Sequence, residues 1–260
     1  MRDRRTGVMY NVPNNNKVGD AHMICFLTSS HNIEGQPALN PANGFAAELL
    51  KSVPQSCRGL AICSDPDDYE RTDFYCDSVR EGFEVSGVTF SDYQVLDARN
   101  QDKTAELVHT ADLIILMGGH VPTQNRFFGE IHLRELLADY DGVIVGISAG
   151  SMNSADVVYA QPELEGEAVS PEYQRFLPGL NLTKTMILPH YQKNKDDTVD
   201  GLRIYEEIAY PDSMGRKFYV LPDGSYLYLY SGREELRGKA WLIEDGIMRK
   251  ISADGDVVAL

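Results

Sequence analysis

The sequence has few cysteines and no long apolar run. Its 260 residues include only four cysteines, and no two of them form a C-x-x-C pair, so we expect reduced structural thiols. No stretch approaches the roughly 18 apolar residues that a membrane span needs. The basic start, residues 1–5, precedes no apolar segment of the about 7–15 residues found in a secretory signal. We therefore expect a cytoplasmic location.

Positive charge is also scarce. The chain has 24 Lys and Arg against 39 Asp and Glu, a net charge of −15. Nucleic acids and anionic membranes bind to basic faces, so we expect neither as a partner. The motifs G-x-G-x-x-G and G-x-x-x-x-G-K-[ST] are missing, and no spacing of His, Asp and Glu is typical of a metal site. We therefore expect no cofactor and no metal, whereas a local arginine remains free to hold a small acidic substrate.

Apolar runs alternate with amphipathic segments along the first part of the chain. The strands that these runs predict are 23–28, 59–63, 88–96, 113–117 and 142–146. The helices predicted between them are 43–53, 69–86, 104–110 and 127–139. Because most of these strands lack polar alternation, they favour a mostly parallel sheet with helices on both faces, a doubly wound α/β fold.

The C-terminal part has a different pattern. Short strands are predicted at 219–221, 226–230, 240–243, 248–251 and 257–259. The Asp-Gly pairs between them favour tight antiparallel hairpins; they are Asp223-Gly224, Asp245-Gly246 and Asp254-Gly255. With no repeat and no clear linker, we expect residues 1–260 to form a single α/β domain. Its polar first 21 residues are expected to form an N-terminal arm or ribbon.

A serine follows one of the predicted buried strands. Residues 143–150 read VIVGISAG, which places Ser148 in a G-x-S-x-G turn. A nucleophilic serine needs a tight, strained strand-to-helix turn, and Gly146, Ala149 and Gly150 supply the small neighbours for it. Ser148 is therefore the candidate nucleophile, and the alternative is a plain strand–helix junction with a capping serine.

An acyl-transfer serine needs a base, and the base needs an acid that orients it. His190 is the only histidine after Ser148, and it follows the apolar run 186–189 as the candidate base. The order serine, histidine, acid offers Asp223, which follows the apolar segment 219–222 and is preferred; its alternative role is the first residue of a hairpin turn. The order serine, acid, histidine would take its acid from a polar stretch with the candidates Asp156, Glu163, Glu165, Glu167 and Glu172.

The second glycine-rich turn, Gly118-Gly119-His120, follows the strand 113–117. It suits a phosphate cradle or a backbone donor to a developing oxyanion. Because the turn is expected near the serine, we favour an oxyanion hole formed by the N–H groups of Gly119 and Ala149, each worth on the order of 3–4 kcal/mol in the transition state.

Three blocks in this order resemble the peptidase E and cyanophycinase family of serine peptidases, relatives of the class I glutamine amidotransferase fold. They are LIILMGG at 113–119, VIVGISAG at 143–150, and the later His190 with LPDG at 221–224. The resemblance implies Ser148 as nucleophile, His190 as base and Asp223 as orienting acid, with the oxyanion hole at Gly119 and Ala149. It also implies hydrolysis of a peptide bond beside an aspartyl residue, at an N-terminal Asp or a β-aspartyl linkage.

An aspartyl carboxylate needs a cationic or multi-donor partner in the pocket. His120, Gln124 and Arg126 follow the glycine turn and are the candidate substrate-binding residues, although Arg126 has a solvent-facing alternative. A glutamine amidotransferase is disfavoured, because it would need Cys at position 148 and Glu in place of Gln192. An esterase and a non-catalytic binding protein stay open. The expected partner is a small peptide, and a homodimer is left open.

Overall fold

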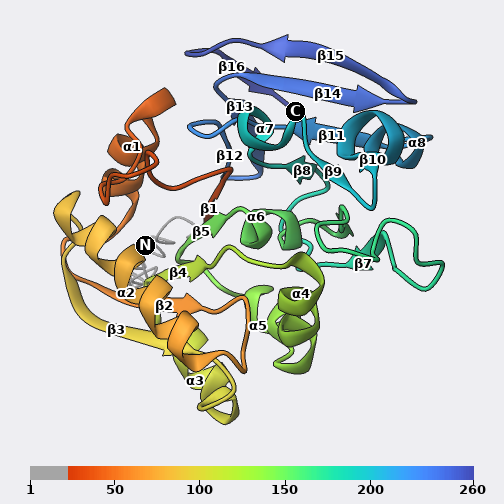
Figure 1. Ribbon diagram of the computed structural model, residues 1–260. Helices are drawn as coiled ribbons and strands as arrows, with labels where there is room; N and C mark the ends of the chain where they lie inside the picture. The colour runs from red at the N-terminus through yellow and green to blue at the C-terminus, as the bar shows by residue number, and fades with distance from the viewer. Residues whose placement is uncertain (1–22) are drawn as a thin grey trace, which may run out of the picture.

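The computed structural model describes residues 23–260, so the predicted N-terminal arm lies outside the described residues (Figure 1). An eight-stranded sheet runs through the centre in the order β16-β13-β12-β1-β5-β4-β2-β3. Its parallel part comprises β1 (Ile24–Thr28), β5 (Val143–Ile147), β4 (Leu113–Leu116), β2 (Cys57–Ile62) and β3 (Phe90–Leu96). The antiparallel part comprises β12 (Tyr226–Tyr230), β13 (Arg233–Arg237) and β16 (Val257–Ala259). The predicted mostly parallel α/β sheet is thus confirmed.

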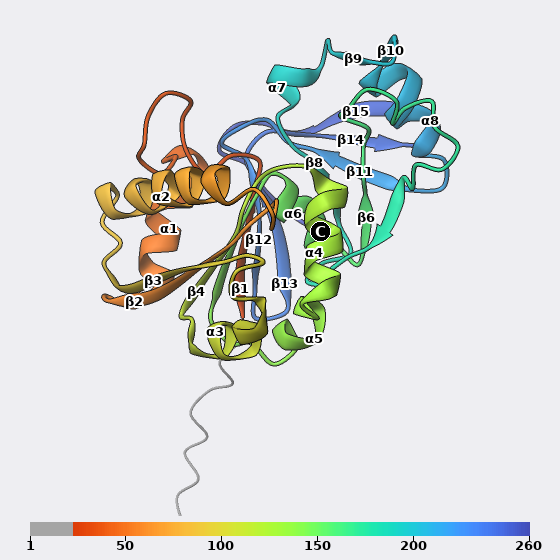
Figure 2. The ribbon, with the colours of Figure 1, turned by 60° about the horizontal axis from the view of Figure 1, so that its bottom comes forward.

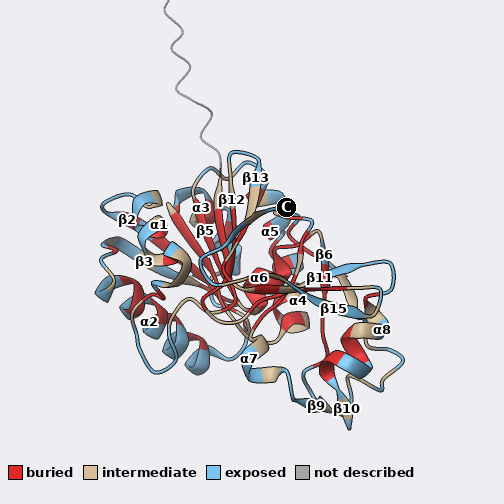
Figure 3. Ribbon diagram, turned by 90° about the horizontal axis from the view of Figure 1, so that it is seen from above, coloured by how far each residue is buried: buried red, intermediate tan, exposed pale blue. Residues whose placement is uncertain are grey.

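Helices cover both faces of the parallel strands (Figure 2). One face carries α1 (Phe45–Ser52) and α2 (Tyr69–Val85), and the other carries α3 (Thr104–Thr110), α4 (Val121–Glu130) and α5 (Leu133–Leu137). Successive strand residues alternate between the two faces: Ile115 packs in the cluster of α1 and α2, while Ile114 and Leu116 pack in the cluster of α4 and α5. Both faces are therefore buried (Figure 3), which explains the uninterrupted apolar runs.

A second sheet lies beside the first, in the order β15-β14-β11-β8. Its strands are β8 (Met186–Leu188), β11 (Lys217–Val220), β14 (Ala240–Glu244) and β15 (Ile247–Ser252). β8 and β11 are parallel neighbours, with Leu188 opposite Val220. The segments that follow them, at His190 and at Asp223, therefore leave the sheet at the same edge.

The predicted helix 127–139 is wrong in its bounds. The structure has two helices there, because α4 begins at Val121 and the chain breaks at His132, whose φ of 53° is left-handed. Pro122 lies in the first turn of α4, where its missing N–H leaves no hydrogen bond unmade.

Shorter elements complete the described chain. They are 3₁₀ turns at Ala42–Gly44 and Gln101–Lys103, α6 (Ala149–Asn153), β6 (Val157–Tyr159), β7 (Phe176–Pro178), α7 (Tyr191–Asn194), β9 (Thr198–Val199), β10 (Leu202–Arg203), a π-helix at Ile204–Ala209 and α8 (Tyr210–Asp212). No helix within residues 23–260 has the length and apolar character to cross a membrane.

Candidate active site

Ser148 occupies a strained turn between β5 and α6. Its backbone has φ 51° and ψ −110°, a conformation that a non-glycine residue adopts only when its surroundings impose it. A Cβ at Gly150 would overlap the carbonyl oxygen of Leu116, and one at Gly146 would crowd the backbone of Ser151. The small residues of the G-x-S-x-G turn are therefore required by the close approach of α6 to the sheet.

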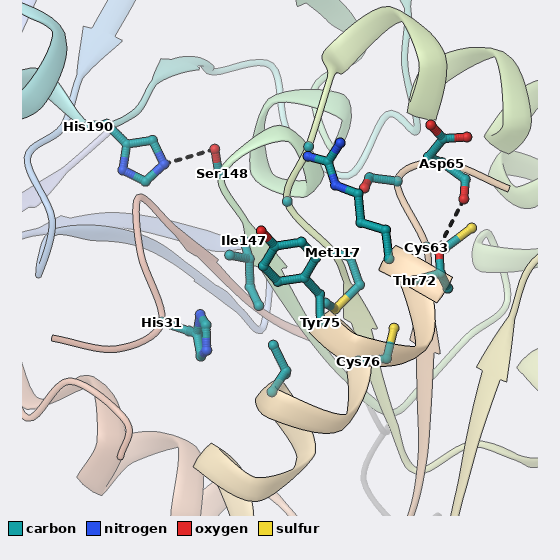
Figure 4. A pocket seen from close by; sticks show the side chains of 15 residues that line it. His31, Cys63, Asp65, Thr72, Tyr75, Cys76, Met117, Ile147, Ser148 and His190 are labelled. Carbon is teal, nitrogen blue, oxygen red and sulfur yellow. Dashed lines mark hydrogen bonds between the residues drawn. The ribbon is translucent and has the colours of Figure 1, made fainter. Parts of the chain in front are cut away.

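His190 connects Ser148 to Asp223. Its Nε2 lies 2.9 Å from Oγ of Ser148, and its Nδ1 lies 2.7 Å from Oδ1 of Asp223. With the proton on Nδ1, the neutral ring donates to the carboxylate and accepts from the serine hydroxyl. Figure 4 shows the imidazole turned toward Ser148. The structure thus brings together the three side chains that the sequence predicted, in one hydrogen-bonded chain.

Asp223 is held by several groups besides His190. Oγ of Ser29 donates to its Oδ1 over 2.9 Å, its backbone N–H donates to Gln192 over 3.0 Å, and Nζ of Lys193 lies 3.3 Å from its Oδ2. Burial raises the pKa of Asp223, but the hydrogen bonds from His190 and Ser29 and the charge of Lys193 outweigh it and lower the pKa to about 2. The carboxylate is therefore ionised at neutral pH.

Ser29 was not predicted from the sequence. It is fully buried just after β1, and its Oγ both donates to Asp223 and accepts from the backbone N–H of His190 over 2.8 Å. One signal pointed to it, since Ser29 directly follows a buried parallel strand just as Ser148 does.

The predicted oxyanion donors lie around Ser148. The turn of Gly118 and Gly119 packs against it, because a Cβ at Gly118 would lie 3.4 Å from the Cβ of Ser148. Within residues 23–260, the N–H of Gly119 has no hydrogen-bond acceptor. Ala149 is the first residue of α6, where backbone N–H groups lack a partner within the helix. Both N–H groups are therefore available to a substrate oxygen.

Two cavities meet at Ser148, His190 and Gly119. The first, of about 300 Å³, is largely apolar and is shown in Figure 4; its other lining residues include His31, Arg71, Tyr75, Cys76, Met117 and Ile147. The second, of about 640 Å³, is more polar; its other lining residues include Met152, Gln161, Glu163, Lys193, Asp196 and Asp197. A peptide that places its carbonyl at Ser148 therefore meets different chemistry on its two sides.

The structure does not bring the three predicted substrate-binding side chains into these cavities; none of them lies among the described residues that line either one. Gln124 is fully buried, with its Nε2 2.6 Å from the carbonyl oxygen of Met117. The Arg126 side chain is 65% exposed and faces a glutamate one helical turn further on. His120 is hydrogen-bonded to Glu167.

Arg71 lines the first cavity and was not predicted from the sequence. It lies in the first turn of α2, and its guanidinium carbon is 5.7 Å from the ring centroid of Tyr75. No carboxylate within residues 23–260 forms an ion pair with it. Its position depends on how α2 crosses the sheet, which local sequence patterns do not specify.

Comparisons with known proteins identify the family of this chain. The model of peptidase family S51 matches residues 25–235. A peptidase from an acI-B1 actinobacterium superposes with a TM-score of 0.61 at 18% identity, covering 92% of this chain and 97% of its own. A proposed peptidase E protein from Listeria monocytogenes EGD-e gives 0.56 at 15% identity, covering 89% and 100%. Among curated proteins no sequence matches. Because the family match spans most of the chain, this protein belongs to peptidase family S51 and is a serine-type peptidase.

Proposed function

We propose that this peptidase hydrolyses a peptide bond in a small peptide, next to an aspartyl or β-aspartyl residue, through an acyl-enzyme on Ser148. The observation that carries the proposal is the hydrogen-bonded chain from Ser148 through His190 to Asp223, at 2.9 and 2.7 Å. These distances are within the range for proton transfer from a nucleophile to a base that a third group orients.

In the proposed reaction, His190 takes the hydroxyl proton of Ser148 as Oγ attacks the carbonyl carbon. The imidazolium is stabilised by the ionised Asp223, and the oxyanion accepts hydrogen bonds from the N–H groups of Gly119 and Ala149. His190 then gives its proton to the leaving amine as the C–N bond breaks. A water molecule repeats the sequence on the acyl-enzyme and releases the acid product and Ser148.

The aspartyl preference is supported by the guanidinium of Arg71 in the first cavity, whose lining also includes Asp65. Arg71 lines this cavity together with Ser148 and forms no ion pair with a carboxylate in the described part of the chain. A guanidinium binds a carboxylate through two parallel hydrogen bonds. We therefore infer that the aspartyl side chain of the substrate enters the first cavity and that the other side of the scissile bond faces the second.

The test combines labelling with kinetics. A fluorophosphonate probe should label the wild-type protein and fail to label Ser148→Ala, because only an activated serine reacts. The same variant should lose hydrolysis of an aspartyl dipeptide by at least about a thousandfold while keeping its circular dichroism spectrum. Full activity in a folded Ser148→Ala protein would reject the mechanism. A preference for the matching ester alone would instead identify an esterase.

A further inference from the structure

His120 ties the glycine turn to a loop far along the chain. Its Nε2 lies 2.8 Å from Oε1 of Glu167, 47 residues further on, and its Nδ1 lies 2.8 Å from the hydroxyl of Thr123. With the proton on Nε2, the ring donates to the carboxylate and accepts from the threonine. The side chains of His120 and Glu167 are only 25% and 13% exposed, so water competes less for this contact than for a surface pair.

Glu167 also holds the wall of the second cavity. Its Oε2 accepts hydrogen bonds from the backbone N–H groups of Glu163, at 2.9 Å, and Leu164, at 3.0 Å, and Glu163 lines that cavity with Gln161. Burial raises the pKa of Glu167, but these two N–H groups and His120 outweigh it and lower the pKa. The carboxylate is therefore charged at neutral pH and keeps both of its contacts.

A continuous path thus joins the two sides of the site. Gly119 lines both cavities, His120 follows it in the chain, and Glu167 connects His120 to the backbone of Glu163. The start of the turn is fixed separately, because the buried amide of Gln124 holds the carbonyl of residue 117. The contact between His120 and Glu167 therefore determines the position of the cavity wall relative to the glycine turn. It does not determine the conformation of the turn.

We propose that His120 and Glu167 are positioning residues that fix the wall of the second cavity relative to the glycine turn, Gly118-Gly119. A substrate bound against this wall then presents its carbonyl to the N–H of Gly119. This inference rests on the proposed function, because it assumes that the peptide spans both the turn and the second cavity.

The two variants to test are Glu167→Gln and His120→Phe. Each should raise KM for an aspartyl dipeptide about tenfold, because the wall is no longer held in register with the turn. A small fluorophosphonate needs Ser148, His190 and the oxyanion donors but not the wall. Its rate of labelling should therefore change less than about twofold in either variant, and this labelling also reports that the variant is folded.

The matched control is Glu165→Gln, which removes a carboxylate from the same loop. Glu165 is exposed and forms no hydrogen bond or ion pair with any residue that the structure describes, so its KM should stay at the wild-type value. The double variant of His120 and Glu167 should be no worse than the stronger single variant, because both act through one contact.

A KM in Glu167→Gln equal to that in Glu165→Gln would overturn the proposal. It would also be overturned if the KM increase in the double variant were the product of the increases in the two single variants. If Glu167→Gln fails to fold, His120→Phe carries the same comparison. Failure of the proposed function is recognised separately, by a wild-type protein that the fluorophosphonate does not label or by an active Ser148→Ala.

Discussion

The hydroxyl of Ser29 donates a hydrogen bond of 2.9 Å to Asp223, although 194 residues separate the two along the chain. The same oxygen accepts from the backbone N–H of His190. Ser29 thereby fixes Asp223 and His190 relative to each other, at a point where β1 and the segments after β8 and β11 meet.

Replacing Ser29 by alanine should lower kcat/KM about tenfold, since Asp223 loses a donor and the His190 N–H loses its acceptor. Ser29→Thr, which keeps the hydroxyl, should recover most of the loss. Ser30→Ala is the control, because within residues 23–260 the Ser30 hydroxyl donates only to Asn32. Equal rates in Ser29→Ala and Ser30→Ala, measured with an aspartyl dipeptide, would contradict this role.

Replacing Asp223 by asparagine should lower kcat by about a thousandfold or more, because a neutral amide no longer stabilises the imidazolium or fixes the ring tautomer. Labelling of Ser148 by a fluorophosphonate should slow in parallel. A nearly normal kcat in Asp223→Asn would show that another group orients His190.

Arg71→Ala should lower the ratio of kcat/KM for an aspartyl dipeptide to that for an asparaginyl dipeptide by about tenfold or more, since a charged hydrogen bond to the substrate carboxylate is removed. The control is Arg126→Ala, an arginine on α4 that lines neither cavity among the described residues. The measurement is kcat/KM for both substrates. If Arg71→Ala leaves the ratio unchanged, the carboxylate is bound elsewhere.

Gln124→Ala should change stability more than substrate preference. Its Oε1 accepts from Asn153 and its Nε2 donates to the carbonyl of Met117, and both hydrogen bonds are buried. Because these buried groups would be left without hydrogen-bond partners, the free energy of unfolding should fall by about 1–3 kcal/mol. Urea unfolding measures it, with the exposed Arg126→Ala expected within about 0.5 kcal/mol of wild type. A fully stable variant with altered preference would contradict this prediction.

His31 should make the protein sensitive to acid. Burial lowers its pKa to about 4, and its Nδ1 has no hydrogen-bond partner among the described residues. An unfolded chain binds this proton near pH ~6.5. The stabilising contribution is therefore complete above that pH and is lost as the pH falls toward 4, by up to about 3 kcal/mol.

Urea unfolding at pH 7.5 and at pH 4.5 tests this expectation. His31→Gln should show a smaller loss of unfolding free energy between the two values than the wild type does. His109→Gln, which replaces an exposed histidine on α3, should behave as the wild type. The same loss in both variants would assign the acid sensitivity to other groups.

Much of the fold was predictable because the strands of a covered parallel sheet are apolar on both faces. β4 and β5 followed from this pattern, and so did the positions of Ser148, His190 and Asp223, each close behind an apolar run. The grouping of those three side chains was inferred from chain order, from their positions after apolar runs and from the family resemblance, and the structure places them within hydrogen-bond distance.

The remaining parts of the site depend on tertiary packing. Gln124 and Arg126 are close to the glycine turn in sequence, but α4 begins at Val121 and turns one side chain inward and the other to solvent. Arg71 is remote in sequence and reaches the first cavity only through the path of α2. Likewise, nothing in a sequence pattern pairs His120 with Glu167.

During synthesis on the ribosome, the turn of Ser148 emerges well before Asp223 has been translated. In the folded protein Asp223 lies just before β12, which pairs antiparallel with β1 and places Tyr226 opposite Thr28. The contact between Asp223 and His190 therefore depends on a strand from the C-terminal part of the chain that pairs with β1. Under the proposed function, a chain truncated before Asp223 would carry Ser148 and His190 without the carboxylate that orients the imidazole.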